Sequence, residues 1–144
     1  MRLISFSKTE QQFRDRIKDV TRRLGWKDLQ PGTLLCGVRK AMGLRKGEQV
    51  ERLGVIRVVS VRMERLDVIT HADVAREGFP NMTPADFVTF FCAAMGCNPT
   101  IDVTRIEFQH VCSWGEWEAG ELRFAEGEAE EDSLVVNSYL GSGR

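Results

Sequence analysis

The sequence has no long hydrophobic run, and this absence argues against a membrane span. About 18–20 consecutive apolar residues are needed to cross a bilayer, whereas the longest apolar stretches here are interrupted by Arg57, Ser60, Arg62 and Thr89. The first residues carry a charge and lead into no apolar block of about 7–15 residues, so we expect no secretory signal. We therefore expect a cytoplasmic protein with no membrane partner.

Metal-ligating residues are scarce as well. The 144 residues include four cysteines and two histidines, and no two cysteines have CxxC spacing. A chain of this length can bury a sizeable core without disulfides or zinc. We therefore expect no metal, no cofactor, and four free thiols in the core: Cys36, Cys92, Cys97 and Cys112.

A net charge near zero hides two regions of opposite charge. Residues 1–113 hold 18 Lys and Arg against 13 Asp and Glu, whereas residues 114–144 hold 2 against 8. The basic region indicates a phosphate-bearing partner. The acidic region has too few large apolar groups to offset the entropy cost of ordering it. We predict one folded domain over 1–113 and an acidic, flexible appendage over 114–144, which alternatively acts as a protein-interaction surface.

The first helix is predicted from a capping box. Ser7 and Glu10 have the required spacing, and the helix they start has Phe13 and Ile17 on its buried side. From Lys18 onwards the pattern fits either a continued helix or an extended segment. The periodicity alone leaves both alternatives open.

Strand and helix patterns then follow in an irregular order. Residues that favour strands occur at 2–6, 33–39, 54–61 and 101–112. Thr70 and Thr83 are typical N-caps, and the helices they start end at Gly78 and Gly96. The second of these helices has an apolar stripe formed by Phe87, Phe90, Phe91, Ala94 and Met95. Because helices and strands do not alternate regularly, we predict the α+β class: a small mixed or antiparallel β-barrel with flanking helices.

Four short motifs together resemble a known family. They are KDVTRR at 18–23, PGT at 31–33, AREGFPNMT at 75–83 and VTRIEF at 103–108. This pattern is similar to the ASCH domain, and the resemblance spans about residues 1–112. ASCH domains share the fold of PUA domains, so the resemblance implies a barrel of five or six strands with a helix over a cleft. It also implies binding of RNA or of a modified nucleoside and, in some members, hydrolysis of one of these.

The resemblance also implies a set of site residues. The family motif after the first helix has the form GxKxxExR, in which Lys18 takes the lysine place and Arg22 or Arg23 the arginine place. Thr21 stands where many members have glutamate, as it does in the acetylcytidine amidohydrolases of this family. Those enzymes are believed to use the lysine and the threonine with a glutamate shortly before Asn-Met-Thr. Here that glutamate is Glu77.

The chemistry of this trio depends on the protonation state of Lys18. Thr21 is a weak nucleophile without a base, and Lys18 can act as that base only if its pKa falls by about 3 from its ordinary value. Arg22 and Arg23 favour that fall, whereas an ionised Glu77 opposes it and serves better as an orienting group or proton donor. A charged Lys18 instead stabilises an oxyanion or holds a phosphate.

Each of these residues also has a purely structural interpretation. Lys18 fits a helix C-terminus, Thr21 an ordinary strand, and Glu77 a solvated last turn. On a flat strand, positions 18 and 21 face opposite ways. An active trio therefore requires a turn or bulge that brings Lys18 and Thr21 within about 3–5 Å of each other.

Aromatic and basic residues near this motif suit RNA. Trp26 offers a stacking surface beside phosphate-seeking arginines, or alternatively packs on the barrel wall. Arg105 either reaches substrate or pairs with a neighbouring carboxylate, and the basic loop near 39–47 either follows a phosphate backbone or is simply solvated. The predicted nucleic-acid-binding residues are Arg22, Arg23, Trp26, Arg105, Arg39 and Lys40.

The leading hypothesis is therefore an ASCH-type domain that binds RNA or a modified nucleoside in a cationic cleft around Lys18. The alternative is a hydrolase, acting on acylated cytidine or on RNA, in which Thr21 is the nucleophile, Lys18 the base and Glu77 the supporting acid. Binding leads because a resemblance in fold supports a cleft better than it supports a reaction.

Overall fold

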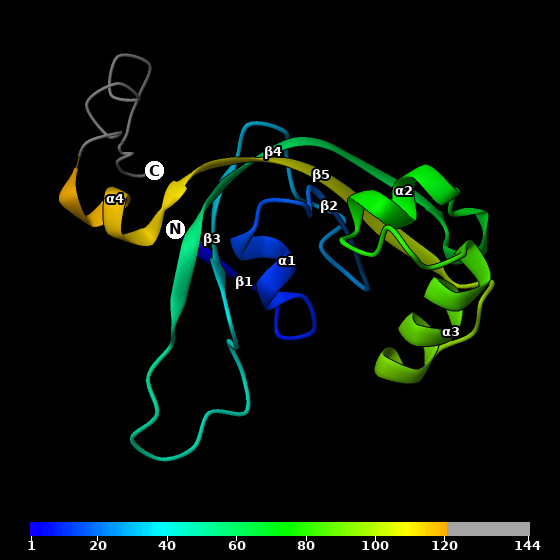
Figure 1. Cartoon of the computed structure of the whole chain (residues 1–144), viewed down its shortest axis with the longest axis horizontal. Helices are drawn as coiled ribbons and strands as arrows, with labels where there is room; N and C mark the ends of the chain where they lie inside the picture. Colours follow the sequence, from blue (N-terminus) through cyan, green and yellow to red (C-terminus); the bar gives the residue numbers. More distant parts are fainter. Residues whose placement is uncertain (121–144) are drawn as a thin grey trace. The chain divides into compact units, whose positions relative to one another are not determined.

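The structure is a computed structural model of the chain, and it describes residues 1–120. These residues form five strands, four α-helices and one 3-10 helix, whose succession is seen in Figure 1. In chain order the elements are β1 (Arg2–Ser5), α1 (Glu10–Arg14), β2 (Val20–Arg23), β3 (Leu34–Val38), β4 (Arg52–Arg65), η1 (Leu66–Val68), α2 (His71–Arg76), α3 (Pro84–Met95), β5 (Asp102–Ser113) and α4 (Trp114–Ala119).

The five strands form one mixed sheet in the order β1-β3-β4-β5-β2. Strand β1 is parallel to β3, whereas β3 is antiparallel to β4 and β2 is antiparallel to β5. A register shift between Gly37 and Val38 interrupts the pairing of β3 with β4. The predicted α+β class, with a small barrel-like mixed sheet and flanking helices, is confirmed.

The chain divides into two compact units. Within the described residues, the first unit comprises 1–8, 34–57 and 110–120, and the second comprises 9–33 and 58–109. The long strands β4 and β5, the two extended arrows of Figure 1, contribute residues to both units. No helix among the described residues is long and apolar enough to cross a membrane.

Helix α4 is part of the core of the first unit. Ser113 and Glu116 form its capping box, and Trp117, only 5% exposed, packs with Val55 and Cys112. The predicted flexible appendage begins at residue 114, but α4 packs into this core through Trp117, so residues 114–119 belong to the folded unit. The predicted appendage and its interaction role, from residue 121 onwards, lie outside the described residues.

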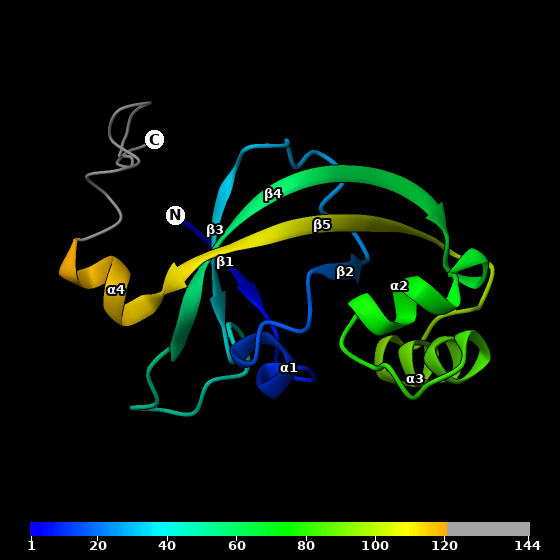
Figure 2. The same ribbon diagram turned by 45° about the horizontal axis from the view of Figure 1, so that its top comes forward.

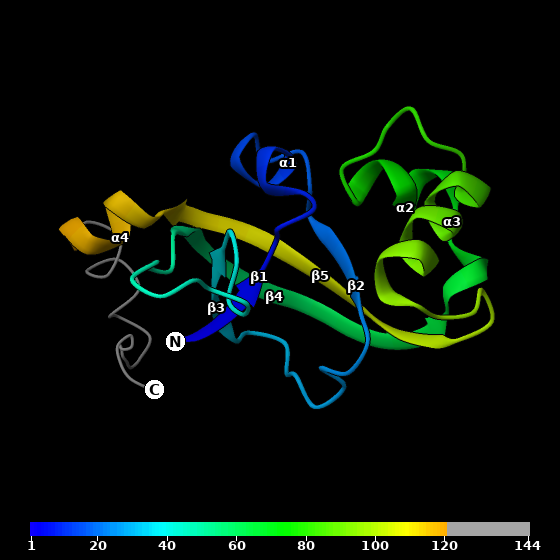
Figure 3. The ribbon, with the colours of Figure 1, turned by 90° about the horizontal axis from the view of Figure 1, so that it is seen from below.

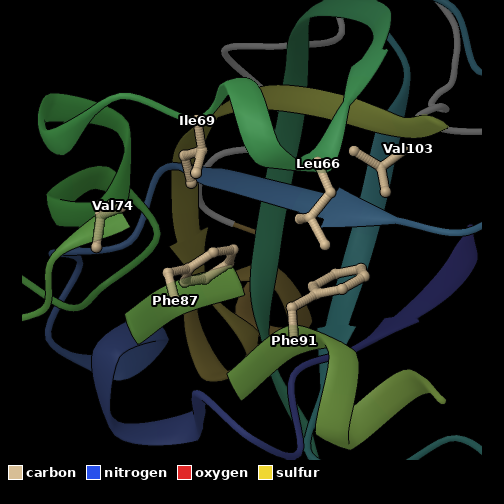
Figure 4. Packing of buried hydrophobic residues seen from close by; sticks show 6 residues of the cluster. All are labelled: Leu66, Ile69, Val74, Phe87, Phe91 and Val103. Atoms are coloured by element: carbon tan, nitrogen blue, oxygen red, sulfur yellow. The ribbon is translucent and has the colours of Figure 1, made fainter. Parts of the chain in front are cut away.

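The second unit has a separate apolar core between η1, α2, α3 and β5. Figure 4 shows its buried side chains, and Figure 2 shows α2 and α3 lying next to each other. Each large side chain buried in this way contributes about 1.5–3 kcal/mol to folding. The cluster consists of Leu66, Ile69, Val74, Phe87, Phe91 and Val103.

The helix caps of this unit are as predicted. The hydroxyl of Thr70 accepts a hydrogen bond from the amide of Asp73, and Thr83 forms a full capping box with Asp86. The predicted apolar stripe of α3 is correct in part: Phe87 and Phe91 are buried, but Met95 is 48% exposed. The last turn of α3 therefore extends past the apolar core.

The prediction for α1 was wrong in two respects. The helix begins at Glu10, and its N-cap Thr9 makes no side-chain cap hydrogen bond. Phe13 is buried as expected and lies against Phe108, but Ile17 is 51% exposed. The helix ends at Arg14, and Arg16 has a positive φ of 60°. Residue 17 therefore lies outside the helix, and the helical spacing that predicted Ile17 on the same buried side as Phe13 does not apply.

Candidate functional site: a buried charge cluster

The turn after α1 places Lys18 in the interior of the second unit. The amides of Ile17 and Lys18 both donate to the carbonyl of Gln12, at 3.1 and 3.3 Å. Lys18 is 2% exposed. Because it precedes β2, the alternation of side chains along that strand does not fix the direction of its side chain. Of the two alternatives open after Lys18, the chain adopts the extended one from Val20.

Lys18 and Glu77 are in direct contact although 59 positions separate them. The Lys18 ammonium donates to Glu77 Oε1 at 2.7 Å and to the Glu77 carbonyl at 2.8 Å. Both side chains are buried. Burial, the largest effect, lowers the pKa of Lys18, and Glu77 only partly opposes it. The structure thus brings together two residues of the predicted catalytic trio.

Gly78 allows this contact. Its φ is +108°, a conformation that L-residues avoid, and a Cβ at this position would lie 2.8 Å from Cβ and Cγ of Gln12. The same Cβ would lie 3.6 Å from Cβ of Lys18. Only a glycine lets the end of α2 approach the turn after α1 so closely, so Gly78 does more than end a helix.

Arg22 binds three carboxylates. Its Nη1 donates to Glu77 Oε2 at 3.0 Å, and its Nη2 donates to Glu64 Oε2 at 2.7 Å and to Asp73 Oδ2 at 2.6 Å. Its Nε is buried without a hydrogen-bond partner among residues 1–120. Arg22 therefore links the Lys18–Glu77 pair to the N-terminal turn of α2 and to the end of β4.

Arg105 completes the arrangement from the neighbouring strand. Figure 3 shows β2 beside β5, and in their antiparallel register Arg22 lies opposite Arg105. Arg105 binds Asp73 through Nε at 2.7 Å and Nη2 at 3.0 Å, the two-pronged geometry typical of arginine. Hydrogen bonds from Arg105 first, and then from Arg22, hold the pKa of Asp73 well below its usual range.

We call these six residues the charge cluster: Lys18, Arg22, Glu64, Asp73, Glu77 and Arg105. Three cations balance three carboxylates. Removing charges from water costs several kcal/mol per ion, and their mutual attraction often does no more than offset this cost. The cluster is therefore a poor device for stability, and buried perturbed ionisable groups mark candidate functional sites.

Sequence reasoning missed Glu64 and the role of Asp73. The amide of Asp73 donates to the hydroxyl of Thr70, the cap of α2. Its role between two arginines depends on the register of β2 and β5, which places the arginines directly opposite each other. An anion between like charges is expected once that register is known. The only signal in the sequence was that Arg22 and Arg105 both lie in strand-forming segments.

Thr21 and Arg23 lie next to each other on β2. Thr21 is 3% exposed, and its hydroxyl oxygen accepts a hydrogen bond from Arg23 Nε at 3.0 Å. Burial lowers the pKa of Arg23 to about 10, against the effect of Glu77. The close approach of Thr21 to Lys18 stays a prediction.

Trp26 follows Gly25 in an unusual stretch of backbone. Both residues have positive φ, 83° and 64°. The hydroxyl of Thr104 donates a hydrogen bond to the carbonyl of Gly25 at 2.5 Å. A left-handed conformation is strained for tryptophan. Trp26 is half-buried, and its stacking role stays a prediction.

The remaining predicted residues belong to the first unit. Arg39 pairs with Glu48 at 2.8 Å and Glu51 at 3.2 Å, and Lys40 pairs with Glu48 at 3.4 Å. The side chains of Arg39 and Lys40 are about one third exposed, that of Glu48 about one quarter and that of Glu51 half. The structure does not place Arg39 or Lys40 in the charge cluster.

All four cysteines are free thiols. Cys36 and Cys112 are buried as predicted, whereas Cys92 and Cys97 are half-buried. Across residues 1–120, no three His, Cys, Asp or Glu side chains are arranged to hold a metal ion.

The fold and the cluster together define a small α+β barrel-like protein with compensated buried charges. In structure it is similar to protein EF3133 from Enterococcus faecalis V583, of the family DUF984, with a TM-score of 0.53 and 13% sequence identity. The similarity covers 78% of this chain and 80% of that one. It concerns the fold alone. No family model and no curated protein matches the sequence.

Proposed function

We propose that the chain binds a modified nucleoside, as its resemblance to ASCH domains implies, with the charge cluster forming the polar end of the site. One observation carries the proposal: three cations and three carboxylates lie together, all of them buried except the half-buried Glu64. Such a group supplies both hydrogen-bond donors and acceptors, and the edge of a nucleobase requires both.

Charge balance favours a neutral ligand over the phosphate backbone of RNA. Phosphate contacts gain affinity by releasing counterions from the nucleic acid. Inside the charge cluster each cation already has a carboxylate partner, so a polyanion gains little there. The buried Nε of Arg22, which has no hydrogen-bond partner among residues 1–120, is a further donor that a ligand could satisfy.

Calorimetric titration tests this proposal with acetylcytidine, cytidine and a single-stranded oligoribonucleotide. We expect acetylcytidine to bind one to one, with a dissociation constant that hardly changes between about 50 and 200 mM salt. Arg23→Gln, which alters the hydrogen bond to Thr21, should weaken binding at least about tenfold. Arg39→Gln is the matched control and should bind like the wild type. Steeply salt-dependent RNA binding without nucleoside binding contradicts the proposal.

A second candidate, hydrolysis of the acyl group, is favoured by the state of Lys18. A lysine whose pKa is lowered by burial has a larger neutral fraction than an exposed one, and only neutral lysine accepts a proton. Glu77 Oε1 lies 2.7 Å from the Lys18 nitrogen and orients this base. These are the requirements of a general base beside a threonine nucleophile.

In this reaction Thr21 Oγ1 attacks the acyl carbonyl carbon and its proton passes to neutral Lys18. The bond from the carbonyl carbon to the exocyclic amine of cytidine then breaks, and the amine leaves with a proton from Lys18. Water hydrolyses the threonine ester, which releases acetate and restores the hydroxyl. Glu77 orients Lys18 throughout.

Acetate release from acetylcytidine tests the second candidate. Thr21→Val keeps the shape of the side chain and removes the nucleophile, so we expect at least a 100-fold loss of turnover. Thr104→Val is the matched control, because Thr104 is an equally buried strand threonine whose hydroxyl bonds Gly25. Equal activity of Thr21→Val and the wild type excludes this mechanism and leaves binding as the function.

A further inference from the structure

The end of α3 brings two cysteines together. Gly96 adopts the left-handed conformation with φ 66° and ψ 44°, which reverses the chain. The amides of Gly96 and Cys97 then both donate to the carbonyl of Cys92, at 2.8 and 3.3 Å. In this kind of helix ending, the residue after the glycine contacts the last turn of the helix. The contact here is between two thiols.

The two sulfur atoms are close and within reach of solutes. Cys92 Sγ and Cys97 Sγ are 3.9 Å apart, and both side chains are half-buried between exposed neighbours at 93–96 and 98–100. Cys36 and Cys112 differ, because they are almost fully buried in the other unit. Burial raises the pKa of Cys36 to about 11, which keeps it a thiol.

We propose that Cys92 and Cys97 are a modification site: a dithiol that a small disulfide such as oxidised glutathione converts to an intramolecular disulfide. One cysteine thiolate attacks a glutathione sulfur, which forms a mixed disulfide and releases one glutathione thiolate. The second cysteine attacks the protein sulfur of the mixed disulfide, which forms the Cys92–Cys97 bond and releases the second glutathione. The cysteine pair loses two electrons and two protons, and the glutathione disulfide gains them.

Either thiol of the pair can begin the exchange. Burial first, and then the neighbouring Cys97, raise the pKa of Cys92. Because the thiolate is the attacking form, attack by Cys92 should become faster as the pH rises. Ring closure requires the sulfur atoms to move from 3.9 Å to about 2.05 Å.

In the test, the full reduced chain is equilibrated in buffers of increasing oxidised-to-reduced glutathione ratio and the exchange is quenched with acid. The free thiols are then alkylated in denaturant, and the mass of the protein is measured before and after alkylation. We expect the oxidised protein to be about 2 Da lighter before alkylation and to take two alkyl groups where the reduced protein takes four. Peptide mapping should find Cys92 joined to Cys97, with Cys36 and Cys112 alkylated. Four alkylated thiols in every buffer, or a bond to another cysteine, overturns the proposal.

Single variants check that each cysteine resolves the mixed disulfide formed on the other. Cys92→Ser should accumulate a glutathione adduct of about 305 Da on Cys97, because the resolving thiol is missing. Cys97→Ser should accumulate the corresponding adduct on Cys92, because its partner thiol is missing. Circular dichroism verifies that each variant is folded, and the alanine variants replace any serine variant that is not. A stable glutathione adduct on the wild type, without ring closure, also contradicts the proposal.

Discussion

The charge cluster around Glu77 and the ion pairs around Glu48 contain the same kinds of residues in different surroundings. Glu77 contacts Lys18 and Arg22 with every side chain at most 3% exposed. Glu48 contacts Arg39 and Lys40 with side chains between one quarter and one third exposed. Burial, and not the number of ion pairs, therefore decides how strongly a charged side chain affects the stability of the molecule.

The largest difference is expected for neutralisation of the two glutamates. Glu77→Gln leaves Lys18 buried without its acidic partner, which should cost about 3–5 kcal/mol of unfolding free energy. Glu48→Gln should leave the urea midpoint at pH 7 unchanged, because its partners remain solvated. The double variant Lys18→Met, Glu77→Gln should regain part of the loss. Equal effects of the two single variants would falsify the comparison.

A smaller difference is expected for the glycine beside each glutamate. Gly78 and Gly47 both have positive φ, so alanine at either position costs about 1–2 kcal/mol. Only at Gly78 does the new Cβ also meet Gln12 at 2.8 Å, whereas nothing lies within 4 Å at Gly47. Gly78→Ala should therefore lose at least about 1 kcal/mol more than Gly47→Ala. Equal losses, measured by urea denaturation, would mean that Gln12 moves aside at little cost in free energy.

The parts of the fold that the sequence predicts are those set by local chemistry. Thr70 and Thr83 cap their helices through amides three residues away, and such contacts are visible in the sequence. Helix α1 was misjudged because Arg16 adopts a positive φ, which no propensity indicates. Ile17, which periodicity would bury, is exposed as a result.

The site was predictable only through resemblance. Periodicity does not connect Lys18 with Glu77, and the motif that did so gave residue types without distances. The roles of Asp73 and Glu64 depend on strand register and on where β4 ends, both of which are tertiary properties. The excess of basic residues over 1–113 was also a poor guide to the site. The cations of the charge cluster are each paired with a carboxylate, so the region around Lys18 has no excess of positive charge.

The two regions should also differ in how their contributions to stability respond to acid. The pKa of Asp73 is held low by Arg105, so below its ordinary pKa of about 3.9 the unfolded chain takes up a proton first. Stability from Asp73 is therefore complete above that pH and is lost as pH falls. Asp73→Asn should flatten the fall in unfolding free energy below about pH 4, and Glu48→Gln should flatten it less. An unchanged slope in Asp73→Asn would mean that its ion pairs do not persist in solution.

The smallest effects are expected from salt. Arg39 gains little from Glu48 and Glu51, because water screens the charges and ordering the long side chain costs entropy. Arg39→Met should melt at the wild-type temperature in about 0.15 M salt, where the Debye length is about 8 Å, and slightly lower in about 0.01 M salt. Arg105→Met should lose the same stability at both concentrations, because the buried Asp73 pair is poorly screened. If salt changes the loss in Arg105→Met as much as in Arg39→Met, the cluster is open to solvent and its charges are not the buried polar end of a binding site.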